Sequence, residues 1–297
     1  MVWRGDDAIG APGVVGRGES GYPESLSDLA QPPERLHFLG DLGALDGSPG
    51  RLVAIVGTRD ASPYGMRVSA ELARAFVSAG IGVVSGLARG IDAAAHQEAL
   101  GAGGSTIGVL GTGVDVPYPA GHRALHAALA SNGLLLSESE PGTPARAGCF
   151  PRRNRIIAAL AKVTIVVEAP FKSGAINTAN HALALGRTVA AVPGPIDSAR
   201  SAGSNELLRD GAHVIGSVDD ALSLLGVSRK QTAGRPPLGE LEASIWEALS
   251  AGAAAPETLV VLAKLPLRQV LEGVARLELH GLVRQGIDGE VERNASI

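Results

Sequence analysis

Short apolar runs alternate with stretches of helical spacing through the central part of the chain. The runs are rich in valine, isoleucine and leucine and cover residues 51–57, 81–86, 105–111, 133–138, 162–169, 188–194 and 212–216. Helical spacing predicts helices over 64–79, 91–100, 120–131, 151–161, 174–185 and 204–209. Strands that alternate with helices in this way are typical of a parallel sheet covered on both faces. The pattern therefore predicts a doubly wound, mostly parallel α/β domain over 21–226.

The segments on either side of this pattern have a different character. Residues 1–20 are rich in glycine and polar residues, and we expect them to be disordered. The proline-punctuated segment 21–42 predicts irregular turns and a helix. Glycine, proline and charge over 227–238 are typical of a linker. Beyond it, 239–297 predicts three short helices and a hairpin turning at Asp288–Gly289, which is the outline of a small winged-helix domain.

Composition narrows the class of protein. No apolar run approaches the roughly 18 residues of a membrane span, and the first residues lack a basic stretch followed by an apolar one. We therefore expect a cytoplasmic protein without a membrane partner. A single cysteine, Cys149, excludes an internal disulfide and a cysteine-rich metal site. The net charge is −4, so any polyanion must be bound by a local patch of cations.

Unusual chemistry gathers where four of the predicted strands end. The loops there carry a cation, a glycine or a small polar residue just before a helix, and these residues are Arg59, Ser85, Gly86, Arg89, Lys172, Ser173 and Gly174. Backbone N–H groups beside a cation at a helix start form a phosphate-binding arrangement. The chain has neither a GxGxxG fingerprint after the first strand nor a Walker motif. The loops therefore predict a phosphate site of another kind.

The fourth loop, GCFPRRNR, leads into the helix predicted over 151–161. Arginine suits bidentate phosphate contacts, and no acidic residue occurs between Glu140 and Glu168. Phe150 stands directly before the arginines, where it would stack on an unpaired base or instead plug the loop. Arg153 shares the inward face of Ile156 and Ile157, so it is either a ligand or a structural ion-pair partner. The predicted ligands from this helix are Phe150, Arg152, Arg153, Asn154 and Arg155.

Other chemistry-bearing residues favour structural roles. Asp92 is expected to cap a helix, His96 to pack inside the domain, and Cys149 to be inert. Glu168 ends a strand near the same edge of the sheet, and alone it makes no catalyst. We therefore expect no enzymatic activity, and neither a cofactor nor a bound metal.

Several of these stretches together resemble the DNA-processing protein A family, also called DprA or Smf. The matching segments include VAIVGTR, SGLARGIDAAAH, GTGVDVPYP, FPRRNRIIAAL and SAGSNELLRDGA, and they follow the family's order over about 22–226. The resemblance implies an extended Rossmann-like fold that binds single-stranded DNA, forms a homodimer through about 212–226, and loads the recombinase RecA in natural transformation. It places DNA on Arg59, the Ser85–Gly86 turn, Phe150, Arg152, Arg155 and the Lys172–Ser173 loop.

Two other functions compete with this hypothesis. Related Rossmann-like folds include phosphoribohydrolases that release bases from nucleotides, but their PGGxGT loop is absent here, where the chain reads AVPGPIDSARSAGSN. Alternatively, the winged-helix domain carries the function and the larger domain is a scaffold, in which case residues 1–226 alone would not bind DNA. Acidic residues outnumber basic ones in that domain, and Arg268 on its expected recognition helix, about 266–279, is followed by Glu272 and Glu278. This balance favours a protein-interaction module over a reader of duplex DNA.

Overall fold

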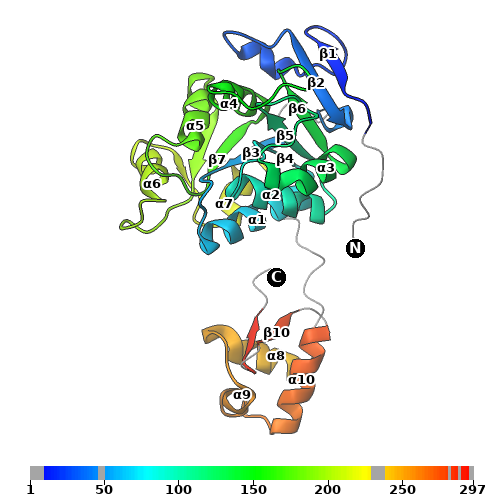
Figure 1. The fold of residues 1–297 in the computed structure, drawn as a ribbon. Helices are drawn as coiled ribbons and strands as arrows, with labels where there is room; N and C mark the ends of the chain where they lie inside the picture. The colour runs from blue at the N-terminus through cyan, green and yellow to red at the C-terminus, as the bar shows by residue number, and fades with distance from the viewer. Residues whose placement is uncertain (1–9, 46–50, 229–237, 280–281, 287–288, 294–297) are drawn as a thin grey trace. The chain divides into compact units, whose positions relative to one another are not determined.

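The chain divides into two compact units, residues 1–229 and 230–297, and each is described by itself. The computed structural model describes residues 10–45, 51–228, 238–279, 282–286 and 289–293 (Figure 1). The division falls inside the predicted linker, 227–238, of which residues 229–237 lie outside the described part of the chain.

A nine-stranded sheet forms the centre of the larger unit. Its strands are β1 (Gly13–Gly16), β2 (Arg35–Gly40), β3 (Leu52–Val56), β4 (Gly82–Ser85), β5 (Thr106–Leu110), β6 (Leu134–Ser137), β7 (Val163–Val166), β8 (Thr188–Ala191) and β9 (His213–Val214). They lie in the order β1-β2-β6-β5-β4-β3-β7-β8-β9. Strands β3 to β9 are parallel, and β2 pairs antiparallel with β6 and β1. The parallel part of the sheet starts at β3, continues outward through β4 and β5 to β6, and returns to the other side of β3 at β7, so the predicted fold class is confirmed.

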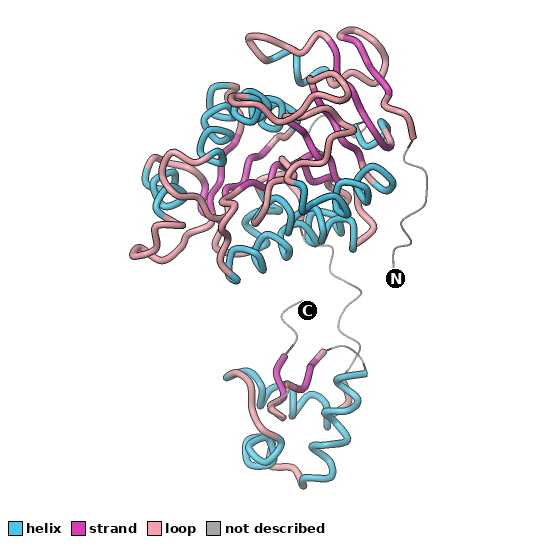
Figure 2. The backbone as a smooth tube through the Cα atoms, in the orientation of Figure 1, coloured by secondary structure: helices cyan, strands magenta, loops and turns pink. Residues whose placement is uncertain are grey.

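Helices cover both faces of this sheet, as Figure 2 shows. They are α1 (Pro63–Ser78), α2 (Ile91–Gly101), α3 (Arg123–Asn132), α4 (Cys149–Leu160), α5 (Gly174–Ala184), α6 (Ala202–Arg209) and α7 (Val218–Ser223), with short 3-10 turns η1 (Glu24–Asp28), η2 (Leu42–Leu45) and η3 (Ala120–His122). One apolar core joins α1, α2 and α7 to Val53 and Ile55 of β3. Another joins α4 and α5 to Ala54 and Val56, because successive strand residues point to opposite faces.

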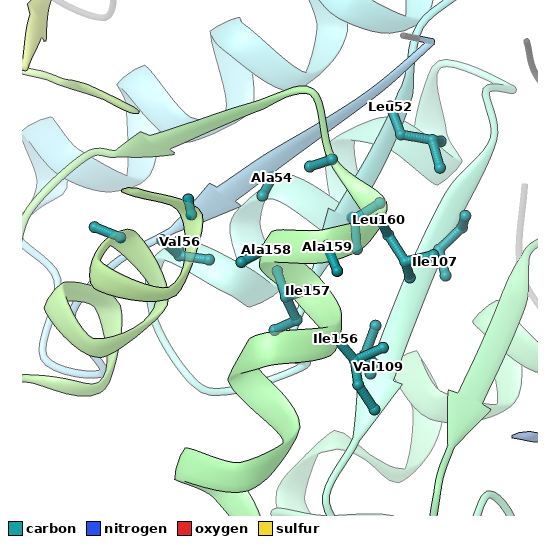
Figure 3. Packing of buried hydrophobic residues seen from close by; sticks show 14 of the residues in the cluster. Leu52, Ala54, Val56, Ile107, Val109, Ile156, Ile157, Ala158, Ala159 and Leu160 are labelled. Atoms are coloured by element: carbon teal, nitrogen blue, oxygen red, sulfur yellow. The ribbon is translucent and has the colours of Figure 1, made fainter. Parts of the chain in front are cut away.

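Helix α4 lies directly on the central strands. Figure 3 shows Ile156, Ile157 and the residues that follow packed against β3 and β5. Ala158 and Ala159 are fully buried, and their small side chains let the helix approach the strands closely. This packing holds the first turn of α4 beside the carboxyl ends of the parallel strands.

The N-terminal part differs from the sequence expectation. Residues 13–16, expected to be disordered, form β1 and pair with β2 from Gly13↔Phe38 to Gly16↔Arg35. The segment 21–42, expected to hold a helix, holds the 3-10 turn η1 and the strand β2. Strand β2 pairs antiparallel with β6, which is far from it in the sequence. Local spacing of apolar residues cannot reveal such a pairing. Residues 1–9 lie outside the described residues.

The smaller unit has three helices and a hairpin, as the sequence predicts. They are α8 (Glu240–Ala248), α9 (Pro256–Ala263) and α10 (Leu267–Leu279), with a turn η4 (Leu249–Ala251) and antiparallel strands β10 (Val283–Gln285) and β11 (Val291–Arg293). Its own core includes Ile245, Leu259, Val270 and Leu277. Gly289 takes the left-handed conformation that such a turn requires (φ 82°), and Asp288 lies outside the described residues.

Candidate nucleic-acid interface

Two adjoining cavities open where the central parallel strands end. Their volumes are about 360 and 460 Å³. Both are lined by Arg59, Ala88, Phe150 and Arg153, so these residues form the ridge between them. Ligands of doubly wound sheets bind at this carboxyl edge. The loops that the sequence singles out therefore meet in space.

An aromatic pair with an arginine forms part of this ridge. The rings of Tyr118 and Phe150 are stacked, with centroids 4.9 Å apart and an interplanar angle of 29°. The Arg59 guanidinium carbon lies 5.6 Å from the Phe150 centroid. Tyr118 is 40% exposed, so this residue is partly open to solvent. Tyr118 belongs to the GTGVDVPYP segment that resembles the family, but the sequence alone did not assign this residue to the site.

Arg153 is buried and supports the first cavity from inside. Its Nη1 donates to the carbonyl oxygens of Gly86, at 2.9 Å, and Val109. Burial lowers the pKa of Arg153 to about 10, although the negative charge of Asp92 acts in the opposite direction. Of the two roles left open by the sequence, the hydrogen bonds fit the structural one, with main-chain carbonyls as the partners.

Asp92 holds the other side of the same turn. Its Oδ2 accepts hydrogen bonds from the backbone N–H groups of Gly86, at 3.1 Å, and Ala88, at 3.4 Å. Burial raises the pKa of Asp92, and the nearby positive charge of Arg153 opposes that shift. A Cβ on Gly86 would lie 2.6 Å from Arg153 Nη2 and 2.9 Å from Asp92 Oδ2. Only glycine fits between these two buried charges without displacing them.

Not every predicted ligand of the first two loops is accessible. Ser85 is completely buried, and its hydroxyl donates to the Ile55 carbonyl oxygen at 2.6 Å. The prediction of Ser85 as a surface ligand is therefore not supported by its position. Gly86 and Arg89 both line the first cavity, and Arg89 is exposed.

The first turn of α5 lines the second cavity. Ser173 caps this helix by accepting a hydrogen bond from the Ile176 N–H at 3.3 Å, and Gly174 follows it. Lys172 is exposed and has a left-handed backbone (φ 54°), but it does not line either cavity. Asn154 Nδ2 donates to Gly174 O at 3.1 Å, which ties α4 to this turn.

Arg152 and Arg155 project from another side of α4 and line neither cavity. Both contact Glu138, which follows β6. Arg155 Nη2 lies 2.8 and 2.7 Å from the two Glu138 carboxylate oxygens, and Arg152 Nη2 lies 2.9 Å from Oε1. Sequence reasoning missed Glu138, because it stands two residues before the acid-free window and meets the helix only through the fold.

Glu168 and His96 both have structural partners. Glu168 is 3% exposed and accepts hydrogen bonds from the Ser62 N–H, at 2.9 Å, and the Ser62 hydroxyl at the start of α1. His96 is completely buried, with Nδ1 2.7 Å from Thr106 Oγ1, and burial lowers its pKa to about 3. Within the described residues, no group of three or more His, Cys, Asp and Glu side chains could hold a metal ion.

Comparison with known families fits this geometry. The model of "DNA recombination-mediator protein A" matches residues 13–226, which hold the whole sheet. The chain belongs to this family. The model of the DprA winged helix domain matches residues 229–289, and the winged-helix prediction is thereby confirmed. Among the described residues, none of the helices is long and apolar enough to cross a bilayer.

Individual relatives extend the comparison. The putative DNA processing protein DprA of Mycobacterium tuberculosis is 44% identical over 246 residues, which are 80% of this chain and 63% of the relative. The chain therefore spans about 63% of that relative's length. The crystal structure of DprA from Streptococcus pneumoniae has a TM-score of 0.68 at 38% identity, covering 71% of this chain and 73% of that one. DprA from Helicobacter pylori, whose structure concerns a single-stranded DNA binding mode, has a TM-score of 0.65 at 32% identity, covering 72% and 95%.

Proposed function

We propose that the chain binds single-stranded DNA across the two cavities at the carboxyl edge of the sheet. The stack of Tyr118 and Phe150 under Arg59 carries this proposal, because unpaired bases expose ring faces that stack on aromatic side chains. Such stacking contributes about 1–3 kcal/mol per base. In duplex DNA those ring faces are covered by neighbouring bases. The DNA-binding mode of the H. pylori relative supports the same ligand.

Exposed cations and helix N–H groups around the stack would bind the phosphates. Arg59 and Arg89 line the cavities, and Lys172 stands at the start of α5 beside the Ser173–Gly174 turn. The chain as a whole is negatively charged, so attraction to DNA depends on this local group. Binding should therefore be strongly salt-dependent and show little sequence preference.

A direct test is fluorescence anisotropy of labelled oligo-dT over a salt series. We expect Phe150→Ala and Arg59→Ala each to weaken binding, Phe150→Ala by about 1–3 kcal/mol through lost stacking. Arg209→Ala is the matched control, because Arg209 is a 73% exposed arginine paired with Glu206 on α6. A chain ending at residue 226 should still bind, because the larger unit has its own core. Wild-type affinity in the Phe150 and Arg59 variants would contradict this site.

We further propose that the bound strand is handed to RecA in natural transformation, and that the chain acts as a homodimer. The strand β9 lies at the edge of the sheet with Val214 57% exposed, which leaves room for a partner at the segment expected to dimerise. Two linked sites would bind one strand with greater avidity. RecA ATP hydrolysis on single-stranded DNA, with and without the protein, tests the first proposal. Sedimentation velocity of wild type and Val214→Asp tests the second, and a monomeric wild type would refute it.

The phosphoribohydrolase and scaffold hypotheses predict other results. A base-releasing enzyme needs a free carboxylate, and the buried carboxylates of Asp92 and Glu168 are bonded to main-chain N–H groups. Base release from nucleoside monophosphates by the wild-type protein would favour the enzyme. Loss of DNA binding in the chain ending at 226 would favour the winged helix as the functional part.

A further inference from the structure

Glu138 joins two arginines that differ sharply in exposure. The side chain of Arg155 is 13% exposed and that of Arg152 is 69% exposed, while Glu138 itself is 21% exposed. Arg155 contacts both carboxylate oxygens, whereas Arg152 shares only Oε1 with it. The two pairs are therefore unequal: one is a fixed, largely buried contact and the other is a single exposed one.

The charges of this group do not cancel. Two guanidinium groups meet one carboxylate, which leaves a net positive charge, and no acidic residue occurs in the sequence between Glu140 and Glu168. Arg155 Nη1 is buried and has no acceptor among the described residues. Glu140, two residues further, is 75% exposed and lies 3.3 Å from His37 Nε2 instead. The cluster of Arg152, Arg155 and Glu138 therefore has more cationic donors than anionic acceptors.

Arg152 also stands next to the proposed DNA site. Phe150 and Pro151, which precede it, line the second cavity. An exposed ion pair is weak and is screened by salt, so Arg152 can leave Glu138 at little cost. A phosphodiester offers the same planar guanidinium a comparable acceptor. Arg155 cannot leave as easily, because removing it from Glu138 would strand a buried charge.

We propose that Arg152 contacts a DNA phosphate, and that Glu138 pairs with Arg152 when no DNA is bound. When single-stranded DNA occupies the cavities, Arg152 exchanges the Glu138 carboxylate for a phosphate of the strand, and Arg155 keeps Glu138 in place. Glu138 is then an internal competitor that weakens DNA binding. This inference rests on the proposed function and adds a path for the strand from the cavities across the first turn of α4.

The test is a double-mutant cycle in the oligo-dT anisotropy assay, with wild type, Glu138→Gln, Arg152→Ala and the combined variant. Glu138→Gln keeps an oxygen for Arg155 but removes the charge, and should tighten binding roughly two- to five-fold, the range of an exposed ion pair. Arg152→Ala should weaken binding and reduce the magnitude of the salt slope by about 0.7, the value for one single-strand phosphate contact. The combined variant should bind like Arg152→Ala alone.

Two controls separate competition from a general charge effect. Glu140→Gln removes a neighbouring charge that contacts His37 and not the arginines, so it should leave the affinity unchanged. Arg209→Ala removes an equally exposed arginine on α6 and should leave the salt slope unchanged. Tightening by Glu140→Gln equal to that by Glu138→Gln, or tightening that persists without Arg152, would overturn the proposal.

A purely structural role for Glu138 gives the opposite sign. If Glu138 only fixed the arginines, Glu138→Gln would weaken binding or leave it unchanged, and either result refutes the competitor. Should Glu138→Gln fail to fold in a thermal unfolding scan, the salt slope of Arg152→Ala against Arg209→Ala still decides whether Arg152 contacts a phosphate. Absence of oligo-dT binding by the wild type would refute the proposed function itself, so the two failures are distinguishable.

Discussion

Arg153 provides the sharpest test of which arginines of α4 are structural. Its guanidinium is buried, donates to the carbonyls of Gly86 and Val109, and balances the charge of Asp92. Replacement by methionine keeps most of the side-chain volume but removes the donor to the Gly86 and Val109 carbonyls and the positive charge near the buried Asp92 carboxyl. Removing one member of such a buried group costs about 3–5 kcal/mol. The two hydrogen bonds from the charged Arg153 side chain, at about 1.5–3 kcal/mol each, give a loss of similar size.

Urea unfolding of Arg153→Met measures this loss directly. The neighbouring Arg152→Met is the matched control, because Arg152 is 69% exposed and its ion pair should contribute less than about 1 kcal/mol. We expect a lower midpoint with an unchanged denaturant slope for Arg153→Met, since the loss is in the native contacts. If both variants unfold within about 1 kcal/mol of wild type, Arg153 does not support the Gly86 turn.

Three further outcomes follow from the same geometry. Gly86→Ala should destabilise the protein by about 1–3 kcal/mol and weaken oligo-dT binding, because its Cβ collides with the Arg153 guanidinium; unchanged thermal unfolding would contradict this. The pKa of His96 is lowered to about 3 in the folded protein, so as pH falls the unfolded chain takes up the His96 proton at a higher pH than the folded chain. The contribution of His96 to stability is therefore complete above the ordinary pKa of 6.5 and is lost as pH falls toward 3, by up to about 1.4 kcal/mol per pH unit. His96→Gln should flatten that pH dependence in urea unfolding, and an equal slope in both proteins would refute it. Tyr118→Ala should weaken oligo-dT binding by about 1–3 kcal/mol while Tyr118→Phe binds like wild type, and equal losses would point to the hydroxyl rather than to stacking.

Much of the candidate site was predictable because its parts are local. Gly86 and Arg89 lie in the loop that follows β4, and Ser173 and Gly174 end the loop that leads from β7 into α5. A parallel sheet brings such loops to one edge. Phe150 on the ridge was predictable for the same reason. The inward position of Arg153 followed from its spacing to Ile156 and Ile157 on one face of α4.

The other parts depend on contacts that spacing does not encode. Tyr118 meets Phe150 across 32 positions of the chain. Ser85 is buried at the end of β4, and its hydroxyl donates to Ile55 on the neighbouring strand. The strand β2 pairs with the edge of β6, and β1 pairs in turn with β2. A short strand has little stability of its own, so its sequence alone carries a weak signal.

The sequence by itself determined the doubly wound sheet, the winged-helix unit and the gathering of glycine-rich, cationic loops at one edge. This was possible because buried apolar residues recur with the period of each helix or strand. Strands that alternate with helices also allow only a few sheet topologies. Only the tertiary structure decided that Glu138 lies against Arg152 and Arg155, 14 and 17 residues away. Periodicity shows which residues are neighbours within one helix or strand. The contact between Glu138 and the arginines of α4 depends instead on how separate elements pack.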